Sequence, residues 1–203
     1  MININKILNA NEVLAGIVKE TPVLFSEEVK QALGVNLFRK AESNQINGSF
    51  KTRGAYFAMH QYFQENKKKD VVAFSSGNHA QGVAYAASLM GVNATIVMPE
   101  DTPMMKIEKT KSLGAKVIFY DRYKESRQAI AKEIASDTAA FLIPAYDHFD
   151  VISGQGTAAL EAIHQMALIE EKINYFICPV GGGGLIAGCS IACLLYTSPS
   201  PRD

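Results

Sequence analysis

Four short β-rich segments recur in this sequence at a nearly constant spacing, and this rhythm restricts the fold more than any other feature. Their starts lie 22 or 23 residues apart, and the segments are 71–74, 94–98, 116–120 and 139–143. The gaps between them carry helical patterns at 79–90, 103–113 and 125–135, the first two of which are followed by glycine. Strands that alternate with such helices are typical of βαβ units. The sequence therefore predicts an α/β protein with open, twisted, mainly parallel sheets and flanking helices.

Further elements are predicted on both sides of this block. Two strand candidates flank it, at 36–40 and 175–179. Apolar spacing predicts helices at 51–63 and 156–168, and another helix starts at Leu185. The apolar run from Leu185 to Tyr196 is shorter than the ~20 residues that a membrane helix needs, which favours a buried helix. The last stretch, 193–203, is rich in serine and proline and is not expected to continue that helix, so it is either foreign sequence or a flexible tail.

Composition favours a small-molecule partner. Lysine plus arginine balance aspartate plus glutamate at 20 each, so no net charge attracts the chain to nucleic acid or to an anionic membrane. The N-terminus lacks the pattern of a secretory signal. Cys178, Cys189 and Cys193 are odd in number and lack the spacing of a metal site, so we expect reduced thiols, no metal and a cytoplasmic location.

The segment Asn47-Gly-Ser-Phe-Lys-Thr-Arg-Gly-Ala55 contains the first chemically unusual residue. Asn-Gly marks a turn and Ser49 is a candidate N-cap, so Lys51 falls in or near the first turn of a helix. The positive end of the helix dipole disfavours protonation of an amine there and leaves more of it able to act as a nucleophile. Such a lysine suits Schiff-base chemistry, although an ordinary exposed lysine fits the local pattern as well.

Two loops follow strands directly. Ser75-Ser-Gly-Asn-His-Ala-Gln-Gly82 gathers hydroxyl, amide and backbone groups at the carboxyl end of a strand, where open α/β sheets bind ligands. Helix capping by Ser76 or Asn78 would explain half of this pattern without a ligand. Pro179-Val-Gly-Gly-Gly-Gly-Leu-Ile-Ala-Gly188 has the form of a phosphate cradle. It also satisfies a loose dinucleotide pattern, which leaves a dinucleotide-binding oxidoreductase open. A nucleophilic amine, a polar loop and a phosphate site together are what pyridoxal phosphate (PLP) requires.

In order and spacing, these motifs resemble those of the PLP-dependent serine/threonine dehydratases, a fold type II (tryptophan synthase β-like) family that includes serine racemases. The resemblance also rests on Val97-Met-Pro-Glu100 and Ser153-Gly-Gln-Gly-Thr157, and it runs from about Leu8 to Ile191. It implies two domains: a larger, incomplete PLP-binding domain made of 1–46 and 144–192, and a smaller inserted domain at 47–143. Residues 193–203 are then a tail outside the family.

The resemblance also implies roles for individual residues. Lys51 carries the cofactor as a Schiff base and moves protons at the substrate α-carbon, while Ser76 occupies the place of a second acid/base in the racemases. Phe50 packs on the cofactor ring and Asn78 binds its 3-hydroxyl oxygen. The phosphate is bound by Gly181, Gly182, Gly183, Gly184 and Leu185, and the substrate carboxylate by Ser75, Ser76, Asn78 and His79.

The implied activity is a lyase of the threonine ammonia-lyase type. Loss of water from L-threonine or L-serine, followed by hydrolysis of the unsaturated product, gives 2-oxobutanoate or pyruvate and ammonia. A serine racemase, a dehydratase for another hydroxyamino acid, and a non-catalytic binding homologue stay open. In the family, the group that faces the ring nitrogen comes from sequence beyond Ile191, so we expect this chain to lack most activity and to expose apolar surface, and we expect a homo-oligomer at full length.

Overall fold

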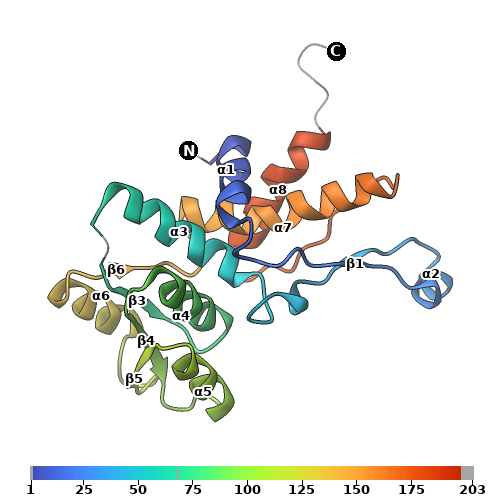
Figure 1. Ribbon diagram of the computed structural model, residues 1–203. Coiled ribbons are helices and arrows are strands. Elements are labelled where there is room, and N and C mark those ends of the chain that lie inside the picture. Colours follow the sequence, from blue (N-terminus) through green and yellow to red (C-terminus); the bar gives the residue numbers. More distant parts are fainter. Residues whose placement is uncertain (1, 68, 198–203) are drawn as a thin grey trace.

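The computed structural model, which describes residues 2–67 and 69–197, builds the β-rich rhythm into one parallel sheet (Figure 1). The strands are β1 (Val23–Leu24), β2 (Arg39–Lys40), β3 (Val71–Phe74), β4 (Ala94–Pro99), β5 (Lys116–Tyr120) and β6 (Phe141–Leu142). The helices are α1 (Ile4–Leu14), α2 (Glu27–Leu33), α3 (Lys51–Glu65), α4 (Asn78–Met90), α5 (Met104–Ser112), α6 (Arg127–Asp137), α7 (Phe149–Leu168) and α8 (Gly184–Thr197), with a 3₁₀ turn at Glu42–Asn44.

The main sheet has the strand order β5-β4-β3-β6, and every neighbouring pair is parallel. The α/β fold class is therefore confirmed, and the strands predicted at 71–74 and 116–120 have the predicted bounds. The last strand is shorter than predicted, because Ala139 adopts a left-handed φ of 51° that interrupts extended backbone before Phe141. The segment predicted at 36–40 contributes only β2, which pairs antiparallel with β1.

Alternate residues of the sheet face two different cores. On one face Ala73, Ile96 and Met98 are buried against α3, α4 and α5. On the other face Val72 and Val97 are buried with Ala131 of α6. This alternation is the two-residue period of a strand, and it explains why apolar residues run continuously through β3 and β4.

A third core lies away from this sheet, where α1, α7 and α8 pack together (Figure 1). Helix α7 begins at Phe149, earlier than the predicted start at 156. The side chain of His148 caps it by accepting the Asp150 N–H, with 3.3 Å between Nδ1 and N. The glycines at 154 and 156 lower helix propensity, but packing overrides this because Gly154 lies against the backbone of α3 and Gly156 against that of α8.

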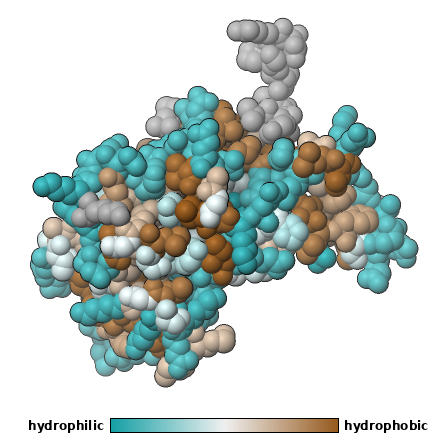
Figure 2. All heavy atoms as spheres, viewed as in Figure 1, coloured by the Kyte–Doolittle hydropathy of each residue, from teal (hydrophilic) through white to brown (hydrophobic). Residues whose placement is uncertain are grey.

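The predicted strand at 175–179 is wrong, because the chain is irregular there. The alternation is real: Phe176 and Cys178 pack against the third core, whereas Tyr175 is 88% and Ile177 85% exposed. A strand also needs a neighbour for its hydrogen bonds, and no described strand lies beside this segment. The expected exposed apolar surface is found here, and in the view of Figure 2 apolar residues reach the surface at several places among hydrophilic ones.

The C-terminal helix is longer than predicted. Helix α8 continues through Tyr196 and ends at Thr197, two residues before Pro199, so serine and proline end it later than expected. Residues 198–203 lie outside the described residues, and the tail and the domain boundaries stay predictions. Over the described ranges, no helix is long and apolar enough to cross a membrane. Cys178 is half-buried and Cys189 buried, and both are free thiols.

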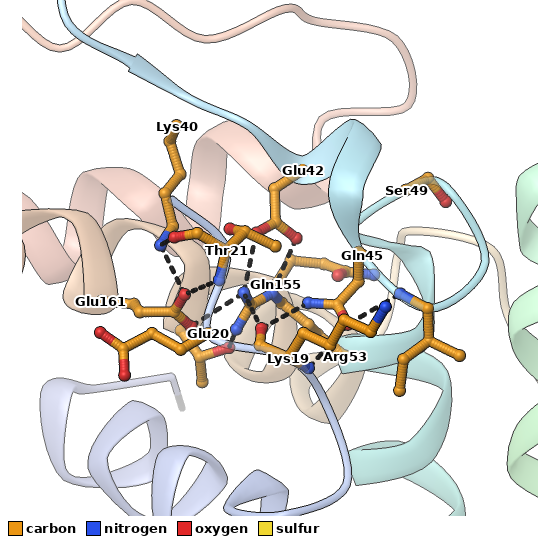
Figure 3. A network of polar contacts seen from close by, with 12 residues as sticks. Lys19, Glu20, Thr21, Lys40, Glu42, Gln45, Ser49, Arg53, Gln155 and Glu161 are labelled. Atoms are coloured by element: carbon orange, nitrogen blue, oxygen red, sulfur yellow. Dashed lines mark hydrogen bonds and ion pairs between the residues drawn. The ribbon is translucent and has the colours of Figure 1, made fainter. Parts of the chain in front are cut away.

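A buried ion network joins α3 to α7 and to the chain around residue 20 (Figure 3). Arg53, which is 1% exposed, donates to both carboxylate oxygens of Glu42 at 2.7 and 2.8 Å, and pairs with Glu161 at 2.9 Å. Lys40 pairs with the same Glu161 carboxylate. Because Arg53 lies two residues after Lys51, this network fixes the helical turn from which Lys51 projects.

Candidate active site

Lys51 is the first residue of α3, as the sequence predicts. Its amine is half-buried and donates to the carbonyl of Ala145 at 2.8 Å, and burial lowers the pKa of the amine. The predicted N-cap is one residue off: Phe50 occupies that position, and Ser49 Oγ accepts the Lys51 N–H at 3.4 Å. The ring centroid of Phe50 lies 5.4 Å from Lys51 Nζ. The Lys51 amine therefore loses its proton more easily than an ordinary lysine, and it lies beside the aromatic ring of Phe50.

The loop after β3 lies against the start of α3. A Cβ placed on Gly82 would lie 3.1 Å from the backbone of Lys51, so α4 and α3 approach very closely here. The N-cap position of α4 is Gly77, which has no side chain, so the alternative that Ser76 or Asn78 caps this helix does not hold. Ser75 Oγ instead accepts the Gly77 N–H at 3.1 Å. Asn78 is exposed as the first residue of α4, so its amide stays available for a ligand.

His79 is buried beneath this loop and is 4% exposed. Its Nε2 lies 3.4 Å from the carbonyl of Ile143, which fixes Nε2 as the donor, while Nδ1 has no partner among the described residues. Burial, and secondarily the charge of Lys51, lowers the pKa of His79 to about 4. The imidazole is therefore neutral at pH 7, and His79 does not supply a positive charge to a substrate carboxylate.

This burial predicts an acid-sensitive fold. Because the folded pKa of about 4 lies below the ordinary 6.5, the unfolded chain binds more protons between these values, and stability is full above pH 6.5 and falls as the pH drops towards 4. The expected loss of unfolding free energy from this group is about 3 kcal/mol. Urea unfolding at several pH values measures it, and His79→Gln should flatten this part of the profile. An equal slope in the variant would assign the acid sensitivity to other groups.

The glycine loop, residues 181–184, lies against Tyr146, which belongs to the same segment after β6 as the Ala145 carbonyl that binds Lys51. Gly183 has a φ of 88°, a conformation that favours glycine, and the helix α8 begins at Gly184 with its N–H groups facing the loop. A Cβ on Gly182 would overlap the ring of Tyr146, and one on Gly184 would lie 2.8 Å from the Tyr146 carbonyl. Backbone N–H groups and a helix N-terminus could bind an anion here, and the residues present fit the phosphate of PLP.

The segment 143–146 therefore contacts all three predicted motifs. The carbonyl of Ile143 faces His79, the carbonyl of Ala145 holds Lys51, and Tyr146 packs on the glycine loop. The sequence analysis did not single out Tyr146. The available signal was its place just after a predicted strand, because the carboxyl ends of parallel strands share one edge of the sheet.

Ser76 borders a polar cavity of about 390 Å³ on the four-stranded sheet, where Pro99 of β4 and Tyr120 of β5 also line it. The other residues that line it are Arg122, Glu125, Ser126, Arg127 and Gln128. Arg127, the first residue of α6, lies with its guanidinium carbon 5.3 Å from the ring centroid of Phe74. Phe74 immediately precedes the serine loop, by which we mean residues 75–78. Arg127 was missed by the sequence analysis, because it is 51 positions away from Ser76 and only the fold brings the two to one cavity.

Comparisons with known proteins agree with this geometry. The family model of the pyridoxal-phosphate dependent enzymes matches residues 14–202. L-threo-3-hydroxyaspartate ammonia-lyase of Saccharomyces cerevisiae is 43% identical, over 92% of this chain and 56% of that protein. L-threonine ammonia-lyase of Thermotoga maritima is 40% identical, over 95% of this chain and 47% of that protein. The structure of maize serine racemase superposes with a TM-score of 0.91 at 38% identity, covering 97% of this chain and 58% of the other. The chain thus spans about half the length of the curated relatives it matches.

Proposed function

This chain belongs to the family of pyridoxal-phosphate dependent enzymes, and on that premise we propose that it is the cofactor-binding part of an ammonia-lyase that removes water from L-threonine or L-serine. The observation that carries the proposal is the half-buried Lys51 amine, whose pKa is lowered by burial and which donates to the carbonyl of Ala145. The next residue, Tyr146, contacts the glycine loop. An amine and an anion site are thereby held on one short segment.

When bound, PLP supplies an aldehyde that links to an amine and a ring that withdraws electrons from the substrate α-carbon. The Lys51 amine would take the proton from the substrate α-carbon. Its lowered pKa helps, because more of the amine is deprotonated and able to accept that proton. Gly181, Gly182, Gly183, Gly184 and Leu185 would bind the phosphate, Phe50 would pack on the ring, and Asn78 would bind the ring oxygen.

The serine loop binds the substrate carboxylate in this proposal. Ser75, Ser76 and Asn78 are half-buried or exposed and present hydroxyl and amide donors. His79 contributes by position: its Nε2 ties α4 to the Ile143 carbonyl and so orients the loop above it. This is a narrower role than the direct contact with substrate expected from the sequence.

A second candidate reaction is the same elimination on a dicarboxylic substrate such as L-threo-3-hydroxyaspartate. The specific observation that favours it is Arg127, whose guanidinium has no ion pair with a carboxylate within the described part of the chain and lines the cavity beside Ser76. A second carboxylate would meet a positive charge there. Loss of water, followed by hydrolysis of the resulting imine to release ammonia, would then give oxaloacetate, in place of 2-oxobutanoate from threonine. For a serine racemase, Ser76 would act as the second acid/base and D-serine would form.

Borohydride trapping tests the proposed function directly. The chain is incubated with PLP at neutral pH and reduced, which converts a C=N bond to a stable secondary amine, and the modified peptide is mapped by mass spectrometry. We expect the modification on Lys51 in preference to the exposed lysines. Modification spread over surface lysines, with Lys51 untouched, would contradict the proposal. Product analysis with threonine, serine and 3-hydroxyaspartate then separates the candidate substrates.

A further inference from the structure

We propose that Tyr146 is a positioning residue that holds the glycine loop, residues 181–184, at a fixed place relative to the Lys51 amine. The inference rests on the proposed function, in which this loop binds the phosphate of PLP. It adds a residue that belongs to none of the motifs in the sequence and that acts through the loop rather than on the reacting atoms.

The first observation is how closely Tyr146 fits the loop. Its ring fills the space that a side chain at Gly182 would occupy, and its carbonyl lies where a side chain at Gly184 would begin. The same residue therefore contacts the loop before and after Gly183, whose φ of 88° makes the turn. Consecutive glycines are the most flexible backbone that a protein can use, and the aromatic face limits where this backbone can lie.

The second observation is where Tyr146 is attached. The carbonyl of the preceding residue, Ala145, accepts a hydrogen bond from the Lys51 amine at 2.8 Å. Pro144, one residue earlier, has a φ that its ring fixes. Ile143 is buried and its carbonyl faces Nε2 of the buried His79. The segment that carries the ring is thus anchored at Ile143 and stiffened by Pro144. Movement of the loop relative to the amine requires movement of the ring or of this anchored segment.

The consequence is a binding site whose two ends are set before the ligand arrives. Ordering a loop on binding weakens affinity, and a loop that is already ordered avoids this loss. Removing the ring should therefore weaken binding of the phosphate end by roughly tenfold, since the freed loop must order at least one backbone residue again. The reaction of the Lys51 amine with an aldehyde that lacks a phosphate should not change.

Two probes separate these effects: PLP and pyridoxal, which has the same aldehyde and no phosphate. The readout is the borohydride-trapped adduct on Lys51, measured against probe concentration for each. The preference is the half-saturating concentration of pyridoxal divided by that of PLP. For Tyr146→Ala we expect the preference to fall by roughly tenfold, with the pyridoxal curve unchanged. Tyr146→Phe should keep the original preference, because the contact involves the ring.

A reciprocal pair of variants tests the contact itself. Gly182→Ala should lose preference for PLP, because its Cβ overlaps the Tyr146 ring. Combining Gly182→Ala with Tyr146→Ala should restore part of the loss, since the smaller residue leaves room for that Cβ. Circular dichroism confirms that each variant is folded, and Tyr146→Phe and Gly182→Ala keep the test valid if Tyr146→Ala does not fold.

The outcomes are distinguishable. An unchanged preference in Tyr146→Ala, or an equal loss for both probes, overturns the positioning role, because a general structural defect affects both curves. No adduct on Lys51 with either probe in the original chain refutes the proposed function, and the positioning role falls with it. A selective loss for PLP, reversed in part by the double variant, supports it.

Discussion

Replacing Lys51 by alanine is expected to abolish the borohydride-trapped PLP adduct at neutral pH and the absorbance band that accompanies it. The physical reason is selectivity by pKa: burial lowers the pKa of this amine, so more of it is deprotonated at neutral pH. Only a deprotonated amine attacks an aldehyde. Absorbance spectra and mass spectrometry of the reduced protein measure the result.

The matched control is Lys106→Ala, which removes an exposed lysine of α5. It should leave both the band and the adduct as in the original chain. Modification at residue 51 should stay absent in Lys51→Ala at every PLP concentration, whatever background modification occurs elsewhere. An adduct of undiminished yield in Lys51→Ala at pH 7 would assign the reactive amine to another lysine.

The sequence predicted the elements that depend on local pattern. The strands β3 and β5 and the helix α4 follow from periodicity and from glycine at the helix end, and Gly91 does adopt the left-handed conformation that this position requires, with a φ of 66°. The position of Lys51 at the start of α3 has the same local origin. These predictions succeed because the residues that determine them lie within a few positions of one another.

Predictions that needed a partner in space were less successful. Residues 175–179 have the alternation of a strand, yet pairing depends on a neighbour that local pattern cannot supply. The start of α7 was placed too late, because the close packing of Gly154 on α3 outweighs the low helix propensity of glycine. Tyr146 and Arg127 were missed for the same reason, since each reaches a motif far away in the sequence.

The ion network around Arg53 is the clearest long-range feature of this kind. Its charges come from residues 40, 42, 53 and 161, and two cations balance two carboxylates. Arginine suits the central position because its planar guanidinium binds both oxygens of Glu42 and still reaches Glu161. From the sequence, Arg53 was only the second residue after a reactive lysine, and nothing local indicated that it is buried.

Arg53→Met is expected to lower the unfolding free energy by about 3–5 kcal/mol, because it removes one partner of a buried pair and leaves an uncompensated carboxylate. Urea unfolding measures the loss. Arg39→Met, at an exposed arginine of β2, is the matched control and should change stability by less than about 0.5 kcal/mol.

The double variant Arg53→Met/Glu42→Gln separates charge from shape. It removes one charge of each sign and leaves Lys40 paired with Glu161, while the side-chain amide oxygen introduced at position 42 can still accept the Thr21 hydroxyl that now donates to Glu42 at 2.6 Å. If the uncompensated carboxylate causes the loss, the double variant should regain much of the stability that Arg53→Met loses, since a neutral amide costs far less to bury than a charge. A double variant no more stable than Arg53→Met would mean that the guanidinium acts by filling space and by its bond to Thr157. In Arg53→Met, the yield of the Lys51 adduct should fall in parallel with stability, because both depend on the same first turn of α3.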